Sequence, residues 1–447
     1  MKITLFWPEL FHPHQLHQMP SLTIAQLGSY LKCLGYDVDY VITDLMYLDL
    51  RKLSEKNSDK LGYFFLRQDI KKIEYSRPDI LLISSWFFNL PYILELTKVL
   101  KKRNPNIIQI LGGYPPTAIP EIILQVSSHL DFLIKGEGEI VLRNLLPILE
   151  KYKSINLDHN SGFLKKLISV KGICFTCKGH NFVNKNEENY IALDDLPFPD
   201  YTQLFKIKSY KELPLLTSRG CNYNKCYFCT STKYSPFRTK SVKYLEKELK
   251  YYHHNFKDIH TISIVDNNFT YNAQRTERIS ELLKKHGYFW RCYSRIDISK
   301  SIIDSMIQNN CIGIFFGLES VNPFILIRLN KAKNVKIYQK KAKEILSYIS
   351  TKYPSLKIDV TYIQIPEHVK ENKQTEKFLL KFPKFFKHIT RIQPIPGCKG
   401  YDKWHMDLVK NRVNKTFFNR KYKNKAILVP EEYGYNALKM VKNSLNE

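Results

Sequence analysis

The sequence has 447 residues, of which 44% are hydrophobic, 13% aromatic and 25% charged. This length is too great for one ordinary domain, and the composition is that of a globular protein with enough apolar side chains for two or three cores. The sequence contains no run of about 18 or more apolar residues, so we expect no membrane span.

The beginning of the sequence, MKITLFWPEL, lacks the apolar stretch and the small-residue cleavage site of a signal peptide. We therefore expect a cytoplasmic protein. A disulfide framework explains the nine cysteines poorly, because the cytosol keeps thiols reduced and the number is odd. The cysteines instead point to metal binding or catalysis.

The formal net charge is +27, and residues 321–447 carry 27 Lys and Arg against 10 Asp and Glu. One interpretation is a solvated basic surface, because Lys, Asn, Ile and Tyr are abundant along the whole chain. The other is an acidic partner such as a substrate, a peptide or a nucleic acid. We expect the first interpretation to hold and no nucleic-acid partner.

Residues 1–150 predict alternating strands and helices. Short apolar runs predict strands at residues 2–6, 38–42, 79–84, 107–111 and 132–134, and helical spacing predicts helices at residues 22–34, 92–102 and 121–126. The unbroken run DILLIS at residues 79–84 indicates a strand buried on both faces. The alternation predicts a parallel, doubly wound sheet, whose ligands bind beyond the carboxyl ends of the strands. Gly112, Gly113 and the turn GEGE at residues 136–139 fall there.

Residues 151–205 interrupt this alternation with a predicted antiparallel hairpin around Gly179, followed by an extended linker at residues 194–200 (DDLPFPD). Six further strands are expected at residues 215–218, 261–265, 289–293, 312–316, 357–363 and 389–393. Pro214 is expected just before the first of them. Six strand–helix units suit an open or partial β/α barrel, and residues 401–447 form a basic tail.

The segment TSRGCNYNKCYFCT at residues 217–230 carries three cysteines on a predicted loop. Cys221, Cys226 and Cys229 have the spacing C-x4-C-x2-C, so their thiolates can converge on one metal centre, and such ligands select iron–sulfur clusters or zinc. A closed structural zinc site needs a fourth protein ligand. A cluster held by three cysteines leaves one iron open for chemistry.

This segment resembles the cluster loop of the radical S-adenosylmethionine (SAM) superfamily, in which SAM binds the fourth iron of a [4Fe–4S] cluster. The usual spacing there is C-x3-C-x2-C, with an aromatic residue just before the last cysteine. Phe228 supplies the aromatic residue, whereas the first spacing is one residue longer here. The resemblance implies that Cys221, Cys226 and Cys229 hold the cluster and that Phe228 lies at the cofactor site.

Further motifs resemble the cobalamin-binding branch of that superfamily. They occur in the expected order at residues 218–221 (SRGC), 265–269 (VDNNF), 295–297 (RID), 317–320 (GLES) and 394–397 (PIPG). The resemblance implies that Asp266, Arg295 and Glu319 line the SAM pocket. A guanidinium can fork onto the carboxylate of SAM, and barrel enzymes place functional groups at the carboxyl ends of strands. Each of the three is also explained as an ordinary polar residue at a strand end.

Residues 20–140 resemble the cobalamin-binding Rossmann domain that precedes the barrel in the same branch, through residues 20–34, 79–85, 111–116 (LGGYPP) and 136–139. Gly112 and Gly113 are expected to permit close approach of a bulky ligand, and they also fit a plain turn. The string D-x-H-x-x-G, whose His ligates cobalt in many such domains, is absent. We interpret His12, His14 and His17 as part of a polar loop.

The remaining cysteines carry weaker signals. Cys174 and Cys177 form a C-x2-C pair in the predicted hairpin, where core packing is favoured over an auxiliary cluster or a zinc site. Cys33, Cys292 and Cys311 lie in predicted helices or strands and are expected to be buried thiols.

We therefore predict an α/β protein with four parts. They are a Rossmann-like, cobalamin-binding type domain at residues 1–150, a linker with a β-hairpin at 151–205, a radical SAM partial (β/α)6 barrel at 206–400 and the tail at 401–447. The resemblance implies that an electron from the [4Fe–4S] cluster cleaves SAM. The resulting 5′-deoxyadenosyl radical then activates a substrate C–H bond, and cobalamin delivers a methyl group.

Two alternatives stay open. A radical SAM enzyme without cobalamin would catalyse cyclisation, rearrangement or oxidation. A basic nucleic-acid-binding protein with a structural zinc would leave the ordered strand-end motifs unexplained. The sequence identifies neither the catalytic residues nor the substrate, which is a small molecule or a peptide. The implied partner is a reductant such as flavodoxin or ferredoxin.

Overall fold

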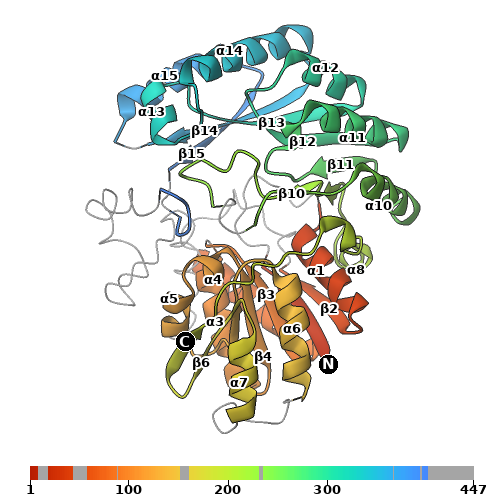
Figure 1. Ribbon diagram of the computed structural model, residues 1–447, viewed down its shortest axis with the longest axis vertical. Coiled ribbons are helices and arrows are strands. Elements are labelled where there is room, and N and C mark those ends of the chain that lie inside the picture. Colours follow the sequence, from red (N-terminus) through yellow and green to blue (C-terminus); the bar gives the residue numbers. More distant parts are fainter. Residues whose placement is uncertain are drawn as a thin grey trace.

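The computed structural model describes residues 1–8, 19–43, 58–87, 89–151, 161–230, 235–365, 367–392 and 395–400. Two sheets form its body, one below the other in Figure 1, and the segment with the three cluster cysteines lies between them. His12, His14, His17 and the tail at residues 401–447 lie outside the described residues.

The first sheet has seven strands in the order β2-β1-β3-β4-β5-β6-β7. The first five are parallel, and the order reverses between β1 and β3, as in doubly wound folds. Its strands are β1 (Lys2–Trp7), β2 (Asp37–Ile42), β3 (Ile80–Ser85), β4 (Ile108–Gly113), β5 (Phe132–Ile134), β6 (Ile173–Cys177) and β7 (His180–Val183).

Helices cover both faces of this sheet (Figure 1). They are α1 (Leu22–Cys33), α2 (Ser58–Ser76), α3 (Leu90–Arg103), α4 (Tyr114–Ala118), α5 (Pro120–Val126), α6 (Gly138–Lys151) and α7 (Ser161–Ser169). Along β3, Ile80 and Leu82 enter the core that contains α1 and α6, whereas Leu81 and Ile83 enter the core that contains α2 and α3. The prediction that this apolar run is buried on both faces is confirmed.

Two features of this half differ from the expectation. Strand β6 pairs antiparallel with β5, so the hairpin that we assigned to the linker extends the first sheet. Helices α2, α4, α6 and α7 were not expected, and in α2 the charged and apolar residues give no clear helical pattern. The domain boundaries at residues 150, 205 and 400 stay predictions.

The second sheet has six strands, all parallel, in the order β15-β14-β13-β12-β11-β8. They are β8 (Leu213–Leu215), β11 (Thr261–Ile264), β12 (Phe289–Arg295), β13 (Cys311–Glu319), β14 (Lys357–Gln364) and β15 (Phe386–Arg391). The expected partial (β/α)6 barrel is confirmed. Pro214 lies inside β8 rather than before it, which an edge strand tolerates because one side of its backbone needs no partner.

The helices of this half cover the outer face of the sheet (Figure 1). They are α10 (Val242–Asn255), α11 (Ala273–Lys285), α12 (Lys300–Gln308), α13 (Pro323–Arg328), α14 (Val335–Lys352) and α15 (Val369–Leu379). The short helix α8 (Thr202–Ile207) instead lies beside β2 of the first sheet. Alternate residues of β13, namely Ile314, Phe316 and Leu318, point into this core. Residues on the other face of β13, including Glu319, are therefore available to a site.

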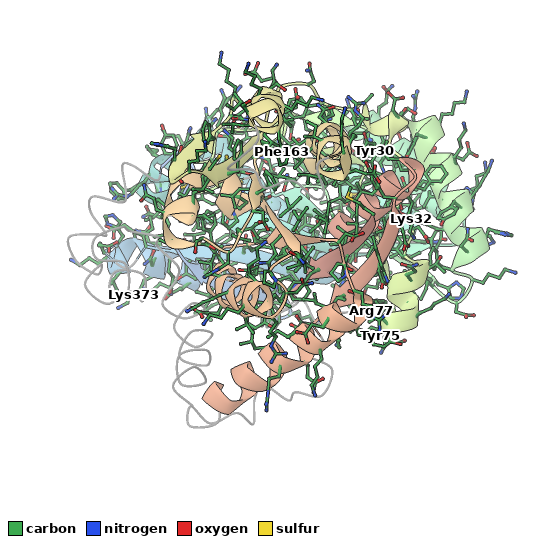
Figure 2. All side chains as sticks on the ribbon, turned by 90° about the horizontal axis from the view of Figure 1, so that it is seen from below. Tyr30, Lys32, Tyr75, Arg77, Phe163 and Lys373 are labelled. Carbon is green, nitrogen blue, oxygen red and sulfur yellow. The ribbon has the colours of Figure 1, made fainter. Side chains whose placement is uncertain are left out.

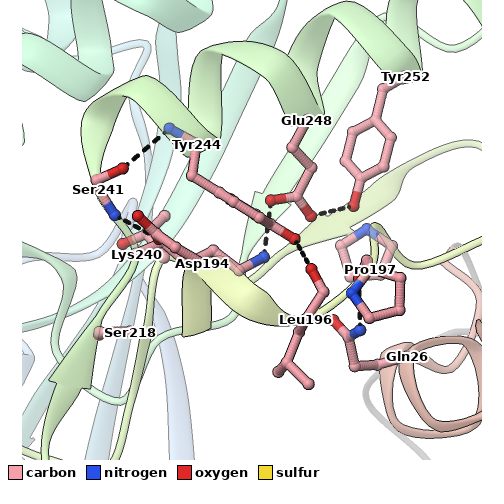
Figure 3. A network of polar contacts seen from close by, with 12 residues as sticks. Gln26, Asp194, Leu196, Pro197, Ser218, Lys240, Ser241, Tyr244, Glu248 and Tyr252 are labelled. Carbon is pink, nitrogen blue, oxygen red and sulfur yellow. Dashed lines mark hydrogen bonds and ion pairs between the residues drawn. The ribbon is translucent and has the colours of Figure 1, made fainter. Parts of the chain in front are cut away.

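The predicted linker contacts both halves of the molecule (Figure 3). Gln26 of α1 donates a hydrogen bond to the carbonyl of Pro197 at 2.7 Å, and the hydroxyl of Tyr244 in α10 donates to the carbonyl of Leu196 at 2.6 Å. The linker thus ties a helix of the first half to a helix of the second.

Side chains tipped with nitrogen or oxygen project outward over much of the outline in Figure 2, where Lys32 and Lys373 lie on opposite sides. None of the described helices is long and apolar enough to cross a bilayer. The interpretation of the basic charge as a solvated surface stays a prediction.

Candidate functional site

Two short antiparallel strands, β9 (Ser218–Arg219) and β10 (Arg238–Thr239), enclose the loop that carries the three cysteines. The side chains of Cys221, Cys226 and Cys229 are all partly exposed. We call residues 220–230 the cysteine loop. Its three thiols are thus accessible to a cofactor.

Neighbouring strand ends hold the backbone of the cysteine loop. Gly220 has φ of +79°, and a Cβ there would lie 2.8 Å from a backbone oxygen, so glycine is required. Asn267 donates to the carbonyl of Gly220, and Asn268 donates to the side-chain oxygen of Asn222, both at 2.9 Å. The VDNNF motif therefore positions the loop through its two amides.

Asp266 lies buried beneath the start of the loop. Its Oδ1 accepts hydrogen bonds from the amides of Thr217 at 2.6 Å and Ser218 at 3.0 Å, and its Oδ2 accepts from the hydroxyls of both residues at 2.6 Å. Four donors thus occupy this carboxylate, which positions β9. The sequence-based prediction that Asp266 contacts SAM stays a prediction.

We expect Asp266→Asn to lower the free energy of unfolding by about 1–3 kcal/mol, because an amide offers one acceptor oxygen and turns its NH2 group toward buried donors. The variant should also lose iron faster during gel filtration. Asp258→Asn, at an exposed carboxylate before β11, is the control. Unchanged stability and iron retention in Asp266→Asn would contradict the positioning role.

Arg295, at the end of β12, already makes a forked ion pair. Its Nε and Nη2 donate to the two carboxylate oxygens of Asp297, each at 2.9 Å, and Nη2 also donates to the carbonyl of Lys331. The guanidinium lies 4.0 Å from the ring centroid of Tyr223, which belongs to the cysteine loop. Arg295 is therefore at the loop, but a SAM carboxylate would have to share it with Asp297.

Glu319, at the end of β13, forms a buried ion pair. Its Oε1 lies 3.1 Å from Nζ of Lys331, and its Oε2 accepts a hydrogen bond from the hydroxyl of Thr361 at 3.0 Å. A Cβ at Gly317 would lie 2.9 Å from both charged groups, so the glycine of GLES makes room for this pair. No motif singled out Lys331, which lies in the stretch between α13 and α14.

The cationic side chains of Lys331 and Arg295 act electrostatically on Cys226 of the cysteine loop. Burial raises the pKa of the Cys226 thiol to about 11, and the charges of Lys331 and Arg295 oppose this rise. A bound metal centre would displace the thiol proton. The structure thus brings Cys226, Arg295, Glu319 and Lys331 together at the carboxyl edge of the second sheet.

The donor set suits an iron–sulfur cluster. Among the described residues, no three Cys, His, Asp or Glu side chains lie close enough to ligate one metal ion. A cluster of four irons does not require this, because each cysteine binds a different iron. Three thiolates on one loop, beside cationic side chains, fit such a group.

Phe228 contributes to the packing of the loop. Its ring lies against a small apolar cluster that includes Ile325 of α13 and Leu329, the residue directly after that helix. This contact fixes the segment between Cys226 and Cys229 on the barrel. A contact between Phe228 and SAM stays a prediction.

The sheet itself explains one of the two glycines assigned to cobalamin. Gly113 has φ of +106°, and a Cβ there would lie 2.2 Å from the carbonyl oxygen of Ser85 in β3. Glycine is therefore required at position 113 for strand packing. A Cβ at Gly112 would meet nothing closer than 3.9 Å. A role for Gly112 or Gly113 in cobalamin binding stays a prediction.

The carboxyl edge of the first sheet approaches the cysteine loop. Burial raises the pKa of Tyr114, directly after β4, to about 12, and Cys229 is near enough to add to the rise. The ring of Trp86, directly after β3, lies 4.7 Å from that of Tyr114. A ligand at this edge would therefore also be close to the loop.

The other cysteines separate into core and surface positions. Cys174 and Cys177 are three residues apart in β6, so they point to opposite faces and enter different cores. Cys292 and Cys311 are buried as expected. The expectation for Cys33 was wrong: it is exposed, because it ends α1 at the rim of the sheet.

Comparison with protein families agrees with this geometry. Residues 215–379 match the model of the radical SAM superfamily, and residues 16–146 match that of the B12-binding domain. The chain belongs to the radical SAM proteins that carry a B12-binding domain. The cofactors of these two domains are a [4Fe–4S] cluster, SAM and cobalamin, and the radical SAM domain is that of an enzyme.

Individual relatives are more distant. An uncharacterized methyltransferase of Pyrococcus horikoshii is 26% identical over 86% of this chain and 78% of its own length. The anaerobic magnesium-protoporphyrin IX monomethyl ester cyclase of Rubrivivax gelatinosus is 23% identical, with 71% of this chain and 55% of that protein aligned.

Among solved structures, the cobalamin-dependent SAM radical enzyme OxsB, with aqua-cobalamin and SAM bound, superimposes with a TM-score of 0.66 at 22% identity. The match covers 91% of this radical SAM protein and 55% of OxsB. This radical SAM protein therefore spans about half the length of OxsB and of the cyclase, and the similarity to OxsB shows the fold.

Proposed function

We propose that this protein is a cobalamin-dependent radical SAM methyltransferase that activates a carbon of a small molecule or a peptide and transfers a methyl group to it. The observation that carries the proposal is the approach of the first sheet to the cysteine loop, where Glu137, after β5, lies 2.7 Å from Arg219, the residue directly before the loop. A cofactor at that edge and a cluster on the loop would face the same space. The P. horikoshii relative, named a methyltransferase, supports the reaction class.

The residues have distinct roles in this proposal. When bound, the cluster supplies an electron to SAM, and cobalamin supplies a carrier for the methyl group. Cys221, Cys226 and Cys229 hold the cluster. Glu319 accepts hydrogen bonds from the SAM amino group, while Lys331 and Arg295 attract its carboxylate. Glu319, Lys331 and Arg295 are charged and largely buried, which strengthens their electrostatic attraction to the amino and carboxylate groups of SAM.

The proposal includes the domain division at residues 1–150 and 206–400. The substrate would be enclosed between the carboxyl edge of the barrel sheet and the B12-binding domain. It also includes a reductant such as flavodoxin or ferredoxin, because the cluster must receive an electron from outside. The site residues Asp266, Phe228, Gly112 and Gly113 contribute by shaping the loop and the sheet edge.

The test is anaerobic purification with iron, sulfide and hydroxocobalamin, followed by metal analysis. We expect about four irons and one cobalt per chain. With a reductant and SAM, 5′-deoxyadenosine reports radical formation and S-adenosylhomocysteine reports methyl donation. Iron without cobalt would contradict methyl transfer and favour cyclisation, rearrangement or oxidation, whereas zinc without iron would contradict the whole proposal.

Glu319→Gln is expected to raise the dissociation constant of SAM about 10- to 100-fold, because the amide loses a charge-assisted hydrogen bond to the amino group. Iron content should stay at the wild-type level, since no cysteine changes. Glu344→Gln, at an exposed carboxylate of α14, is the matched control. Calorimetry on the iron-loaded protein measures the affinity, and equal affinities in both variants would remove Glu319 from the SAM site.

A further inference from the structure

A group of four charged side chains joins the B12-binding domain to the cysteine loop. Nη1 of Arg219 lies 2.7 Å from Glu137, and Nη2 of the same guanidinium lies 2.6 Å from Glu139. Arg238 makes a further ion pair with Glu137. We call these four residues the charge clamp.

The four residues come from two turns that are far apart in sequence. Glu137 and Glu139 flank the start of α6, in the turn that opens at Gly136 with φ of +76°. Arg219 and Arg238 lie directly opposite each other in the β9–β10 pair, which encloses the cysteine loop. Arg219 is separated from Cys221 by a single residue, so a displacement of the clamp reaches the first cluster cysteine directly.

Bringing these four charged side chains together costs free energy, through repulsion between like charges and through loss of hydration. Two arginines directly opposite each other on paired strands repel. All four side chains are at least four-fifths removed from solvent, so each also loses hydration. Burial alone would raise the pKa of Glu137, but Arg219, Ser235 and Arg238 together hold it below its usual value. The carboxylate therefore stays charged against two cations.

Semi-buried ion pairs add little net stability, but they fix one geometry, since removal of either partner leaves an uncompensated charge. The fork of Arg219 is suited to this, because its two nitrogens engage two different carboxylates. Nη1 of Arg238 also donates to the carbonyl of Ile191, shortly before the extended part of the linker at residues 194–200, at 2.7 Å. The clamp thus fixes domain, loop and linker together.

We propose that the charge clamp sets the position of the cysteine loop relative to the B12-binding domain, with Arg219 as its positioning residue. The clamp then fixes the separation between the cluster and cobalamin, an inference that rests on the proposed function. Neither arginine touches a cofactor in this role. Each acts through the loop that it holds.

The test measures the geometry between the domains in the full, iron-loaded chain. Of the nine cysteines, all of which lie in described residues, Cys33 is the exposed one, and the three partly exposed cysteines would be occupied by the cluster, so a nitroxide label can be attached to Cys33 after cluster assembly. Pulsed electron paramagnetic resonance then gives the distance distribution between this label in α1 and the reduced cluster. The measurement needs neither substrate nor cobalamin.

We expect a narrow distribution in the wild type and a broad or shifted one in Arg219→Gln and Glu137→Gln. With cobalamin bound, S-adenosylhomocysteine formation should fall about 100-fold in Arg219→Gln, because small displacements of reacting groups have effects of this size. 5′-Deoxyadenosine formation should continue. Arg219→Lys should restore part of the loss, since an ammonium reaches one carboxylate but cannot fork onto two.

Glu74→Gln is the matched control, because Glu74 forms an exposed ion pair with Arg103 in the same domain. It should leave distance and products unchanged. An unchanged narrow distribution in both Arg219→Gln and Glu137→Gln would overturn the clamp. If Arg219→Gln fails to hold iron, the distance distributions of Glu137→Gln and Arg238→Gln are measured instead. A broad or shifted distribution supports the clamp, and an unchanged narrow one overturns it. A wild-type protein with iron but no cobalt would contradict the proposed methyl transfer, while the distances would still test the clamp.

Discussion

Cys226→Ala is expected to purify without its iron–sulfur cluster and to form no 5′-deoxyadenosine from SAM. Cys226 lies between the other two cluster cysteines in sequence and beside the positive charges of Lys331 and Arg295. Those charges favour a thiolate, and its removal leaves two ligands for a group that requires three. Iron should fall from about four per chain to less than one, as measured by metal analysis.

Cys33→Ala is the matched control for this experiment. Cys33 is exposed at the end of α1, in the other half of the molecule, and should be dispensable for iron binding. Circular dichroism of Cys226→Ala separates loss of the cluster from loss of the fold, and Cys226→Ser gives a second, isosteric replacement. Wild-type iron content together with SAM cleavage in both Cys226 variants would refute the cluster assignment.

Most strands of both sheets could be predicted from the sequence, because buried parallel strands leave short apolar runs that end in glycines or polar residues. The runs at β3 and β13 are examples. The pairing of the hairpin β6–β7 could not be predicted in the same way. Its own residues specify the antiparallel hairpin, but the edge that it joins is set by contacts with β5, about 40 residues earlier.

Candidate site residues could be predicted from the sequence where they belong to a short sequence motif. The three cysteines and Glu319 belong to such strings, and the structure places Cys226 and Glu319 at the same edge. Their partners were not predictable. Lys331 pairs with Glu319 across a helix, and Arg219 pairs with Glu137 across 82 residues. Which opposite charges meet depends on the packing of distant elements.

Lys240→Met is expected to destabilise the protein by about 3–5 kcal/mol, because it leaves a buried carboxylate without its counter-charge. Nζ of Lys240 lies 2.7 Å from Glu248, and the two side chains are 1% and 0% exposed (Figure 3). The hydroxyl of Tyr252 donates to the same carboxylate at 2.8 Å but cannot neutralise it. The backbone amide of Lys240 also donates to the carbonyl of Thr217, just before the cysteine loop.

The midpoint of thermal unfolding should therefore fall by about 10 °C in Lys240→Met, given the size of the second half of the molecule. The double variant Lys240→Met/Glu248→Leu should regain most of this loss, because it removes the buried charge altogether. Lys250→Met is the control within α10, the helix that carries Glu248, since Lys250 pairs with Glu246 at 3.7 Å on the exposed face. A double variant as unstable as Lys240→Met would show that packing of the lysine stem, rather than charge pairing, holds α10 against the start of the cysteine loop.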